Sequence, residues 1–299
     1  MKKIMIVGGG GVGGYIAGKL LQNTQDVTLI ARGEHLEAIK KNGLKIIDED
    51  SEFTVKPSII TDNPKGLGRY DIIILAVKSY DLAGALEIIK ENVSSNTILL
   101  PLLNGVEHDK EIREIYKNAK VLNGCIYILS NIKEPGVIKK YGGVFHLMFG
   151  AQEKNLDEFQ PLKELFDEAG LLSKLTSNIE FETWRKFLLV NSYAAINSYY
   201  KKPLGWVVEN KMDELEKVLN EIKSIANKKD IPLEEKNVQN VLDRAKKLPY
   251  NSKMSMQLDF EKGKKTEVET LCGFIVKEGE KVGVKTPVMK EIYEKLAGH

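Results

Sequence analysis

A glycine-rich stretch near the N-terminus is the part of the sequence whose residue types and spacing most directly predict chemistry. Gly8, Gly10 and Gly13 fit the pattern G-x-G-x-x-G, directly after an apolar run at residues 3–7. In this pattern the first glycine allows a tight turn, the second lets the backbone approach a pyrophosphate, and the third lets a helix lie close to a strand. We therefore expect this loop to bind a dinucleotide, through Gly8, Gly9, Gly10, Gly11, Val12 and Gly13.

The end of the next apolar run indicates which dinucleotide is bound. A site for NAD needs an Asp or Glu there to accept a hydrogen bond from the ribose 2′-OH. The run at residues 27–30 ends without a carboxylate, and Arg32 follows it. A guanidinium pairs with a 2′-phosphate through its forked donors, and Lys78, just past the run at residues 71–77, could reach the same group. The sequence favours NADP(H), with two ordinary surface cations as the alternative.

Hydride transfer to a ketone requires a proton donor close to the developing alkoxide. The four histidines, His35, His108, His146 and His299, stand in no pattern that marks one of them as this acid. Lys186 lies within a strongly apolar stretch, a setting in which desolvation lowers the pKa of an amine and suits it to proton transfer. By pattern alone, such a residue is more often a lysine that packs its stem on apolar surface and keeps its amine in water.

These residues need a scaffold, and the first half of the chain predicts strands that alternate with helices. Short runs rich in Ile, Val and Leu predict strands at residues 3–7, 27–30, 71–77 and 97–102. Runs that are apolar at nearly every position suit strands buried on both faces, as in a parallel sheet. Apolar spacing of three to four residues predicts helices at residues 12–22, 34–41 and 80–91. This alternation indicates a Rossmann-type, doubly wound α/β domain.

Further along, the pattern changes from mixed to helical. Residues 51–55 and 137–147 predict additional, antiparallel strands, with a turn at Gly142 and Gly143, and residues 156–169 predict a helix ended by Gly170. Helical spacing then occupies residues 180–199, 212–228, 234–247 and 266–282. We therefore expect an NADP-binding domain at residues 1–175 and an all-helical substrate or catalytic domain at residues 176–299.

The composition argues against several other classes of protein. There are 44 Lys and Arg against 42 Asp and Glu, a net charge of +2, whereas nucleic-acid binding calls for a basic surplus. The two cysteines, Cys125 and Cys272, form neither metal-ligand spacing nor a disulfide framework, and Cys125 lies in an apolar run typical of a buried thiol. No run has the length of an export signal's apolar core or of a membrane span. We expect a cytoplasmic protein without a metal, whose partner is a small-molecule substrate.

Short motifs in a constant order run along nearly the whole chain. In addition to the glycine loop they are Arg32, Ala76-Val77-Lys78, Asn104-Gly105-Val106, Trp184-Arg185-Lys186, Ser255-Met256 with Asp259, Thr266-Glu267, Gly283-Val284 and Thr286-Pro287. With these motifs the sequence resembles the ketopantoate reductases (2-dehydropantoate 2-reductases), NADPH-dependent enzymes of pantothenate synthesis. The spacing from Ser255 through Asp259 to Glu267 is the family's own, and the agreement of many motifs is more specific than any single one.

The resemblance implies roles that the local patterns alone do not. In such enzymes the residue matching Lys186 is the general acid that protonates the ketone oxygen. The residue matching Glu267 hydrogen-bonds the substrate hydroxyl and helps position that lysine, although by pattern alone Glu267 would be a solvated helix carboxylate. The resemblance also places Asn104 beside the nicotinamide and the substrate, and Ser255 near the substrate carboxylate. The residues that match the holders of the 2′-phosphate are Arg32 and Lys78.

One departure from the family concerns the substrate side. The family usually has two asparagines four and eight residues after the catalytic lysine, on one helix face, but Val190 and Ala194 occupy these positions. Asn191 lies one step further on and is rotated by about 100° from that face, unless a bulge restores the register. We keep Asn191 as an expected substrate contact. The cofactor half of the assignment therefore rests on closer matches than the substrate half.

The combined expectation is an NADPH-dependent reduction of 2-dehydropantoate to pantoate. One alternative is a reductase of another branched 2-keto acid, which the shifted asparagine favours. Another is a sensor that binds NADP(H) without catalysis, against which the presence of both Lys186 and Glu267 argues. A homodimer is the assembly that we allow for.

Overall fold

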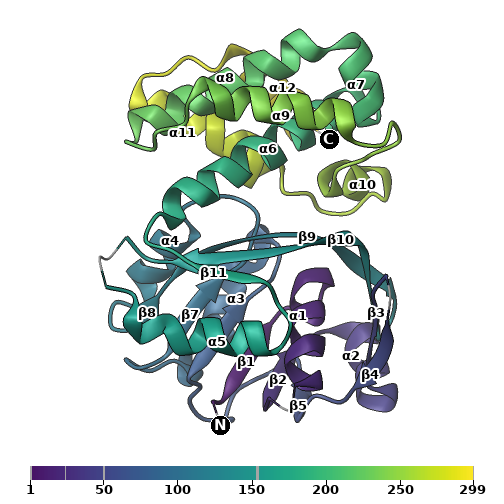
Figure 1. The fold of residues 1–299 in the computed structure, drawn as a ribbon, viewed down its shortest axis with the longest axis vertical. Coiled ribbons are helices and arrows are strands. Elements are labelled where there is room, and N and C mark those ends of the chain that lie inside the picture. The colour runs from purple at the N-terminus through teal and green to yellow at the C-terminus, as the bar shows by residue number, and fades with distance from the viewer. Residues whose placement is uncertain (1, 24, 50, 153–154, 299) are drawn as a thin grey trace. The chain divides into compact units, whose positions relative to one another are not determined.

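The computed structural model describes residues 2–23, 25–49, 51–152 and 155–298, which form two units (Figure 1). The first unit contains the chain up to Leu103 and from Glu107 to Ile179. The second contains Asn104–Val106 and Glu180–His299. The three residues Asn104–Val106 therefore belong with the helical second unit, although the chain on both sides of them belongs to the first. Of the four histidines, His299 lies outside the described residues.

The first unit is built on a six-stranded sheet whose neighbouring strands pair in parallel. The strand order is β5-β2-β1-β6-β7-β8. The bounds are β1 Ile4–Val7, β2 Val27–Ile30, β5 Ile59–Thr61, β6 Ile72–Leu75, β7 Ile98–Pro101 and β8 Lys120–Val121. Every residue of β1, β2 and β6 is buried, as expected for parallel strands covered on both faces. The four strands predicted for this sheet are confirmed.

Helices cover both faces of this sheet. Their bounds are α1 Gly11–Gln22, α2 Gly33–Asn42, η1 Ser79–Asp81, α3 Leu82–Ile88, η2 Lys90–Asn92 and α4 His108–Ile115. Successive side chains of a strand point to opposite faces. Ile4 and Ile6 of β1 accordingly pack in one core with α1, whereas Met5 and Val7 pack in another with α3 and α4. The predicted doubly wound fold is confirmed, and the helix predicted at residues 80–91 is divided into η1, α3 and η2.

A second sheet in the first unit has the order β11-β10-β3-β4, with β9 paired to β10. Its bounds are β3 Leu44–Ile47, β4 Glu52–Val55, β9 Asn123–Glu134, β10 Val137–Gly150 and β11 Ser173–Leu175. The two predicted strands, β4 and β10, pair antiparallel with β3 and β9, which the sequence pattern did not predict. β10 also pairs in parallel with β3 and β11. Before β11, η3 (Asp157–Phe159) and α5 (Gln160–Glu168) form the helix predicted to end at Gly170.

The turn predicted at Gly142 and Gly143 is wrong. Both residues lie inside β10, where pairing with β9 shifts register between Lys140 and Phe145. Gly142 has a φ of +69°, a conformation that glycine adopts readily and that accommodates an irregularity within a strand. The chain reverses earlier, at Gly136 between β9 and β10, where φ is +83°. Two glycines inside a strand and one glycine in a turn cannot be told apart by residue type alone.

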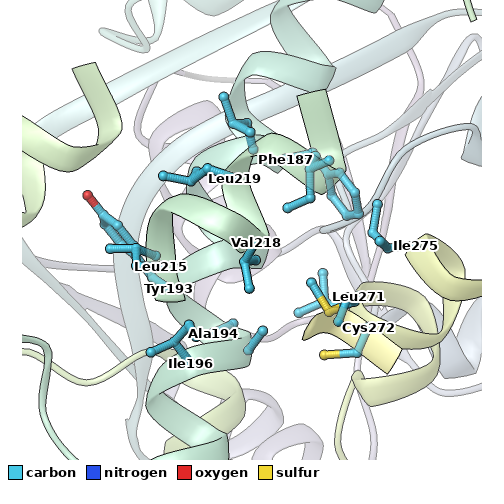
Figure 2. Close-up of a cluster of buried hydrophobic side chains, with 14 of the residues drawn as sticks. Phe187, Tyr193, Ala194, Ile196, Leu215, Val218, Leu219, Leu271, Cys272 and Ile275 are labelled. Carbon is cyan, nitrogen blue, oxygen red and sulfur yellow. The ribbon is translucent and has the colours of Figure 1, made fainter. Parts of the chain in front are cut away.

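The second unit is helical. Its elements are α6 Ile179–Tyr200, α7 Leu204–Asn210, α8 Met212–Lys228, α9 Glu235–Lys247, α10 Ser255–Glu261, η4 Glu269–Gly273, α11 Phe274–Val282 and α12 Pro287–Ala297. The four predicted helices correspond to α6, α8, α9 and the η4–α11 pair, and η4 is a π-helix. Side chains of α6 pack against α8 and against η4 and α11 in one buried core; Figure 2 shows Phe187 and Ala194 near Val218 and Leu271.

Candidate active site

The glycine loop joins β1 to α1 and is packed tightly against neighbouring backbone. Gly8 has a φ of +110°, and a Cβ at this position would lie 2.6 Å from the main-chain oxygen of Ala76. A Cβ on Gly13 would lie 2.0 Å from the oxygen of Gly8, and one on Gly11 would lie 2.4 Å from the oxygen of Ser130. Because real Cβ atoms do not approach backbone so closely, a larger residue at any of the three would displace the loop or its neighbours.

Gly10 differs from these glycines because the space beside it is open. Outside its immediate chain neighbours, a Cβ at Gly10 would meet no heavy atom of the described chain within 4 Å. Gly10 is the N-cap of α1, and the first turn of this helix holds no acidic residue. The first N–H groups of a helix lack helical partners and carry partial positive charge. The position therefore suits a phosphate, both sterically and electrostatically.

His35, on α2, links the glycine loop to the turn between β9 and β10 through two hydrogen bonds. Its Nδ1 accepts a hydrogen bond of 2.9 Å from the Gly136 N–H, so the ring proton of the neutral form lies on Nε2. Nε2 lies 2.8 Å from the main-chain oxygen of Gly9 and donates to it. Burial lowers the pKa of His35, against the opposing effect of the hydrogen bond to Gly9. His35 thus clamps the loop in its neutral form. The sequence pattern did not reveal this role, because His35 is 26 residues from Gly9.

Arg32 and Lys78 follow the ends of β2 and β6, the two strands that flank β1. Parallel strands end at one edge of a sheet, so both residues lie along the edge that carries the glycine loop. Arg32 is exposed at the N-cap of α2, and Lys78 is half-buried at the start of η1. The structure therefore places these two predicted residues with Gly8–Gly13, at one edge of the sheet.

Three polar residues from distant parts of the sequence meet within the second unit. The Nζ of Lys186 donates a hydrogen bond of 3.1 Å to Oδ1 of Asn104, and Nδ2 of Asn104 donates one of 3.4 Å to Oε2 of Glu267. The exposed fractions of Lys186 and Glu267 are 8% and 2%. The Asn104 amide thus links a buried amine to a buried carboxylate, and these three residues are called the lysine cluster below.

Aromatic packing positions Lys186 on α6. Trp184 and Phe187 lie on either side of it in the sequence, and their rings meet edge to face with centroids 5.7 Å apart. Phe274, from α11, contacts both rings, at 6.1 Å and 5.8 Å. Such pairs contribute about 0.5–1.5 kcal/mol beyond the area that they bury. The turn of α6 that carries the amine is therefore anchored by large buried side chains.

Asn191 lies away from the face of α6 on which the family's asparagines stand. α6 is a continuous α-helix from Ile179 to Tyr200, so no bulge restores the register. Asn191 is fully buried, and its Nδ2 donates a hydrogen bond of 2.8 Å to the main-chain oxygen of Leu271 in η4. Ala194, four residues further than Val190, belongs to the apolar core. A contact between Asn191 and the substrate remains a prediction.

Ser255 is the first residue of α10 and is exposed. Within the described chain, no hydrogen bond joins its side chain to Lys186, Asn104 or Glu267. The structure therefore brings together three of the residues predicted for substrate binding and catalysis, and it leaves Ser255 outside the lysine cluster.

The two thiols lie in apolar cores. Cys125 and Cys272 are 1% and 0% exposed, and burial raises the pKa of the Cys272 thiol to about 12. The buried, inert thiol predicted at Cys125 is confirmed as buried. Among the described residues, no three His, Cys, Asp or Glu side chains are grouped so that they could hold a metal ion. In the same part of the chain, no helix combines the length and apolar character that crossing a membrane requires.

The parallel sheet, the glycine loop after its first strand and the helical second unit define a Rossmann-type protein with a helical partner unit. Two family models match the chain: "Ketopantoate reductase PanE/ApbA" over residues 4–153 and "Ketopantoate reductase PanE/ApbA C terminal" over residues 178–299. Together they cover well over half of the chain. The chain belongs to the ketopantoate reductase family, and it is an oxidoreductase of that family.

Individual relatives and solved structures match nearly the whole chain. The 2-dehydropantoate 2-reductase of Pyrococcus horikoshii is 31% identical, over 96% of this chain and 93% of its own. An uncharacterised oxidoreductase of Bacillus subtilis, YkpB, is 27% identical, over 98% and 97%. The crystal structure of 2-dehydropantoate 2-reductase from Porphyromonas gingivalis W83 matches with a TM-score of 0.87 at 30% identity, covering 99% of both chains. D-mandelate dehydrogenase, solved with NADH and anilino(oxo)acetate, shares the fold at 24% identity and a TM-score of 0.88, over 98% and 96%.

Proposed function

We propose that the protein is an NADPH-dependent reductase of 2-dehydropantoate, which it converts to pantoate. The observation that carries this proposal is the lysine cluster, in which one amide holds the Lys186 amine and the Glu267 carboxylate. A relative at 31% identity bears the name of this activity. We assign nucleotide binding to the first unit and substrate binding with catalysis to the second. The boundary predicted at residue 175 lies four residues before the last residue of the first unit, Ile179.

The lysine cluster supplies the proton that reduction of a ketone requires. When bound, a nicotinamide dinucleotide supplies hydride to the keto carbon, and the electron pair of the C=O bond moves to oxygen. Lys186 Nζ then transfers a proton to this oxygen, which yields the hydroxyl group of the product. Asn104 Oδ1 accepts a hydrogen bond from the same Nζ and so directs it before transfer. A buried site strengthens the interaction between the ammonium and the developing alkoxide.

Glu267 acts beside Lys186 in this scheme. Its carboxylate accepts a hydrogen bond from Asn104 Nδ2, which fixes the amide with its oxygen toward Lys186. A carboxylate is an acceptor only, so its other acceptor positions suit a hydroxyl of the substrate. The resemblance to the family supports this role, together with a place for Asn104 beside the nicotinamide. Ser255, at the start of α10, is the residue that we assign to the substrate carboxylate.

The cofactor residues of the first unit fit a dinucleotide that carries a 2′-phosphate. The backbone from Gly8 to Gly13 would hold the pyrophosphate, because Gly10 leaves open space at the N-terminus of α1. Arg32 and Lys78 would hold the 2′-phosphate at the same edge of the sheet. The absence of a carboxylate at the end of β2 favours NADPH over NADH.

A second candidate is the reduction of another branched 2-keto acid. Val190 and Ala194 stand where the family usually has asparagines, and Asn191 is directed to the main chain of Leu271. A substrate pocket with fewer amide donors would favour a substrate with fewer hydroxyl groups, because buried polar groups without partners cost binding energy. This candidate keeps the roles of Lys186 and of the cofactor residues.

The test is to mix the protein with NADPH and 2-dehydropantoate and to follow the loss of NADPH absorbance. A panel should include 3-methyl-2-oxobutanoate, which lacks the hydroxyl, and phenylglyoxylate, which is aromatic. The proposal expects the highest kcat/KM for 2-dehydropantoate. A higher value for 3-methyl-2-oxobutanoate would select the second candidate. NADPH binding without turnover of any keto acid would contradict both and favour the sensor.

A further inference from the structure

A cavity of about 610 Å³ lies within the second unit. Its wall comes from the C-terminal end of α6, from α10 and the loop after it, and from the end of α12. Neither Lys186, Asn104 nor Glu267 lines this cavity. Ser198, which does, is twelve residues beyond Lys186 on α6, or about 18 Å along the helix axis. Thr266 and Val268, on either side of Glu267 in the sequence, do line it. The cavity therefore adjoins the loop that carries Glu267, but none of the three side chains of the lysine cluster belongs to its wall.

Two buried polar side chains in the wall have an atom without a partner. Ser198 and Gln257 are 3% and 1% exposed. The Oγ of Ser198 and the Oε1 of Gln257 make no hydrogen bond within the described chain. Gln257 Nε2 donates to Oε1 of Glu261 at 3.2 Å, which leaves the amide oxygen as the unpaired atom. Buried polar groups are nearly always hydrogen-bonded in folded proteins, so this pair points to a ligand.

The charges around the cavity indicate what kind of ligand it would hold. Lys201, Lys264 and Lys265 line the wall together with two carboxylates. Both carboxylates already have a partner. Glu261 forms a salt bridge of 2.8 Å with Lys253, and Glu269 forms one of 2.9 Å with Lys277. Since neither of these partner lysines lines the cavity, Lys201 and Lys264 leave a surplus of positive charge in the wall.

We propose that this cavity binds a small anion that also carries a hydroxyl or N–H group, such as a hydroxycarboxylate or the phosphate ester of a hydroxylated molecule. The lysines attract the anionic group, and the Ser198 hydroxyl donates a hydrogen bond to one of its oxygens. Gln257 Oε1 accepts a hydrogen bond from the hydroxyl or N–H group of the ligand. Phe260, Val268 and Leu296 supply an apolar wall for its carbon atoms.

Calorimetric titration of the protein with malate, glycerol 3-phosphate and acetate tests the proposal without any use of turnover. Malate represents hydroxycarboxylates, glycerol 3-phosphate represents phosphate esters, and acetate lacks a hydroxyl. We expect at least one of the first two to bind at least about tenfold more tightly than acetate, because each carries a hydroxyl and a second negative charge that acetate lacks. Binding of neither compound, or equal binding of all three, would overturn the proposal.

Variants locate the binding. Ser198→Ala and Lys264→Ala should each weaken binding about tenfold, whereas Lys262→Ala, in the same loop but outside the wall, should not. Ser198→Ala should unfold at the temperature of the native protein or above it, because the hydroxyl that it removes has no protein partner. Lys186→Ala should bind the anion as the native protein does. Equal losses of anion affinity in Lys262→Ala and Lys264→Ala would place the ion elsewhere and refute the site. A loss of anion affinity in Lys186→Ala would do the same.

Discussion

The side-chain amide of Asn191 donates a hydrogen bond of 2.8 Å to the main-chain oxygen of Leu271, inside the π-helix that follows Glu267. A π-helix bonds residues five apart, so its junctions with α-helix leave main-chain groups without their usual partners. Asn191 adds a side-chain hydrogen bond from α6 to the middle of this segment. The residue five positions after Lys186 thereby braces the segment that begins next to Glu267.

Replacement of Asn191 by alanine should lower the free energy of unfolding by about 0.5–1.5 kcal/mol, because a buried hydrogen bond to the oxygen of Leu271 would be lost. Urea unfolding measures this loss. Asn197→Ala is a matched control, since Asn197 is also fully buried on α6 and donates to the oxygen of Lys202 at 2.8 Å. If Asn191 also contacts the substrate, its variant alone should raise the KM for the keto acid. An unchanged free energy of unfolding in Asn191→Ala would contradict the bracing role.

Replacement of Lys186 by alanine should lower kcat by about 10²–10⁴-fold, the usual contribution of a positioned general acid. NADPH binding, followed by fluorescence, should remain. Asn104→Ala should reduce kcat by a smaller factor, because the amine would persist without the hydrogen bond that directs it. Thr183→Ala, a change of a buried residue on the same helix, controls for general damage to α6. Full turnover in Lys186→Ala would remove this lysine from the mechanism.

Two alanine substitutions in the glycine loop should have opposite consequences. Gly13→Ala should lower the free energy of unfolding by about 1–3 kcal/mol or more, as overpacking does, because its Cβ would lie 2.0 Å from the Gly8 oxygen. Gly10→Ala should unfold much like the native protein, since its Cβ meets open space. It should nevertheless weaken NADPH binding at least about tenfold, because the methyl group would occupy the place of a phosphate. Native affinity in Gly10→Ala would argue against a pyrophosphate at this position.

Arg32→Glu should reverse or reduce the proposed preference for NADPH over NADH. The change removes the forked donor for the 2′-phosphate and adds an acceptor for the ribose 2′-OH. The ratio of kcat/KM values for the two cofactors should fall at least about tenfold, the effect of about 1.4 kcal/mol. Lys41→Glu, with the same change of charge at the exposed end of α2, should leave the ratio unchanged. An equal ratio in Arg32→Glu and the native protein would assign the preference to other residues.

The stability of the protein should depend on pH through His35. Burial lowers its pKa below the ordinary value of 6.5, so the unfolded chain binds a proton at a higher pH than the folded protein. The contribution of neutral His35 is complete above about pH 6.5, is lost as pH falls toward the lowered pKa, and then levels off. A protonated ring would also face the Gly136 N–H with a second donor, which should loosen the glycine loop and weaken NADPH binding.

Urea unfolding and NADPH titration between pH 5 and pH 8 measure this dependence. His35→Ala should bind NADPH more weakly at neutral pH. Its free energy of unfolding should also depend less steeply on pH between about pH 5 and 6.5. His108, which is half-buried at the start of α4, offers a control as His108→Ala. A slope that persists unchanged in His35→Ala would assign the pH dependence to other groups.

Much of the first unit could be predicted because its signals are local. Glycines at a fixed spacing after an apolar run identify the β1–α1 junction, and runs of Ile, Val and Leu identify β2, β6 and β7. The β9–β10 ribbon was assigned only in part, since its strands of twelve and fourteen residues do not keep a regular alternation. β9 runs from buried to exposed, and β10 has an exposed middle with buried residues toward both ends. The true turn of the ribbon carries one glycine, whereas the bulge inside β10 has two.

The sequence by itself determined the fold class, the dinucleotide loop and the identity of the residues that could do chemistry, because these depend on residue type and short spacing. Tertiary structure decided which of them meet. Asn104 is 82 residues from Lys186 and 163 from Glu267, and no local pattern relates residues so far apart. Tertiary structure also decided that Asn191 bonds to the backbone of Leu271 and that His35 bonds to the glycine loop. A side chain's partner depends on which helices pack together, and packing is a property of the whole chain.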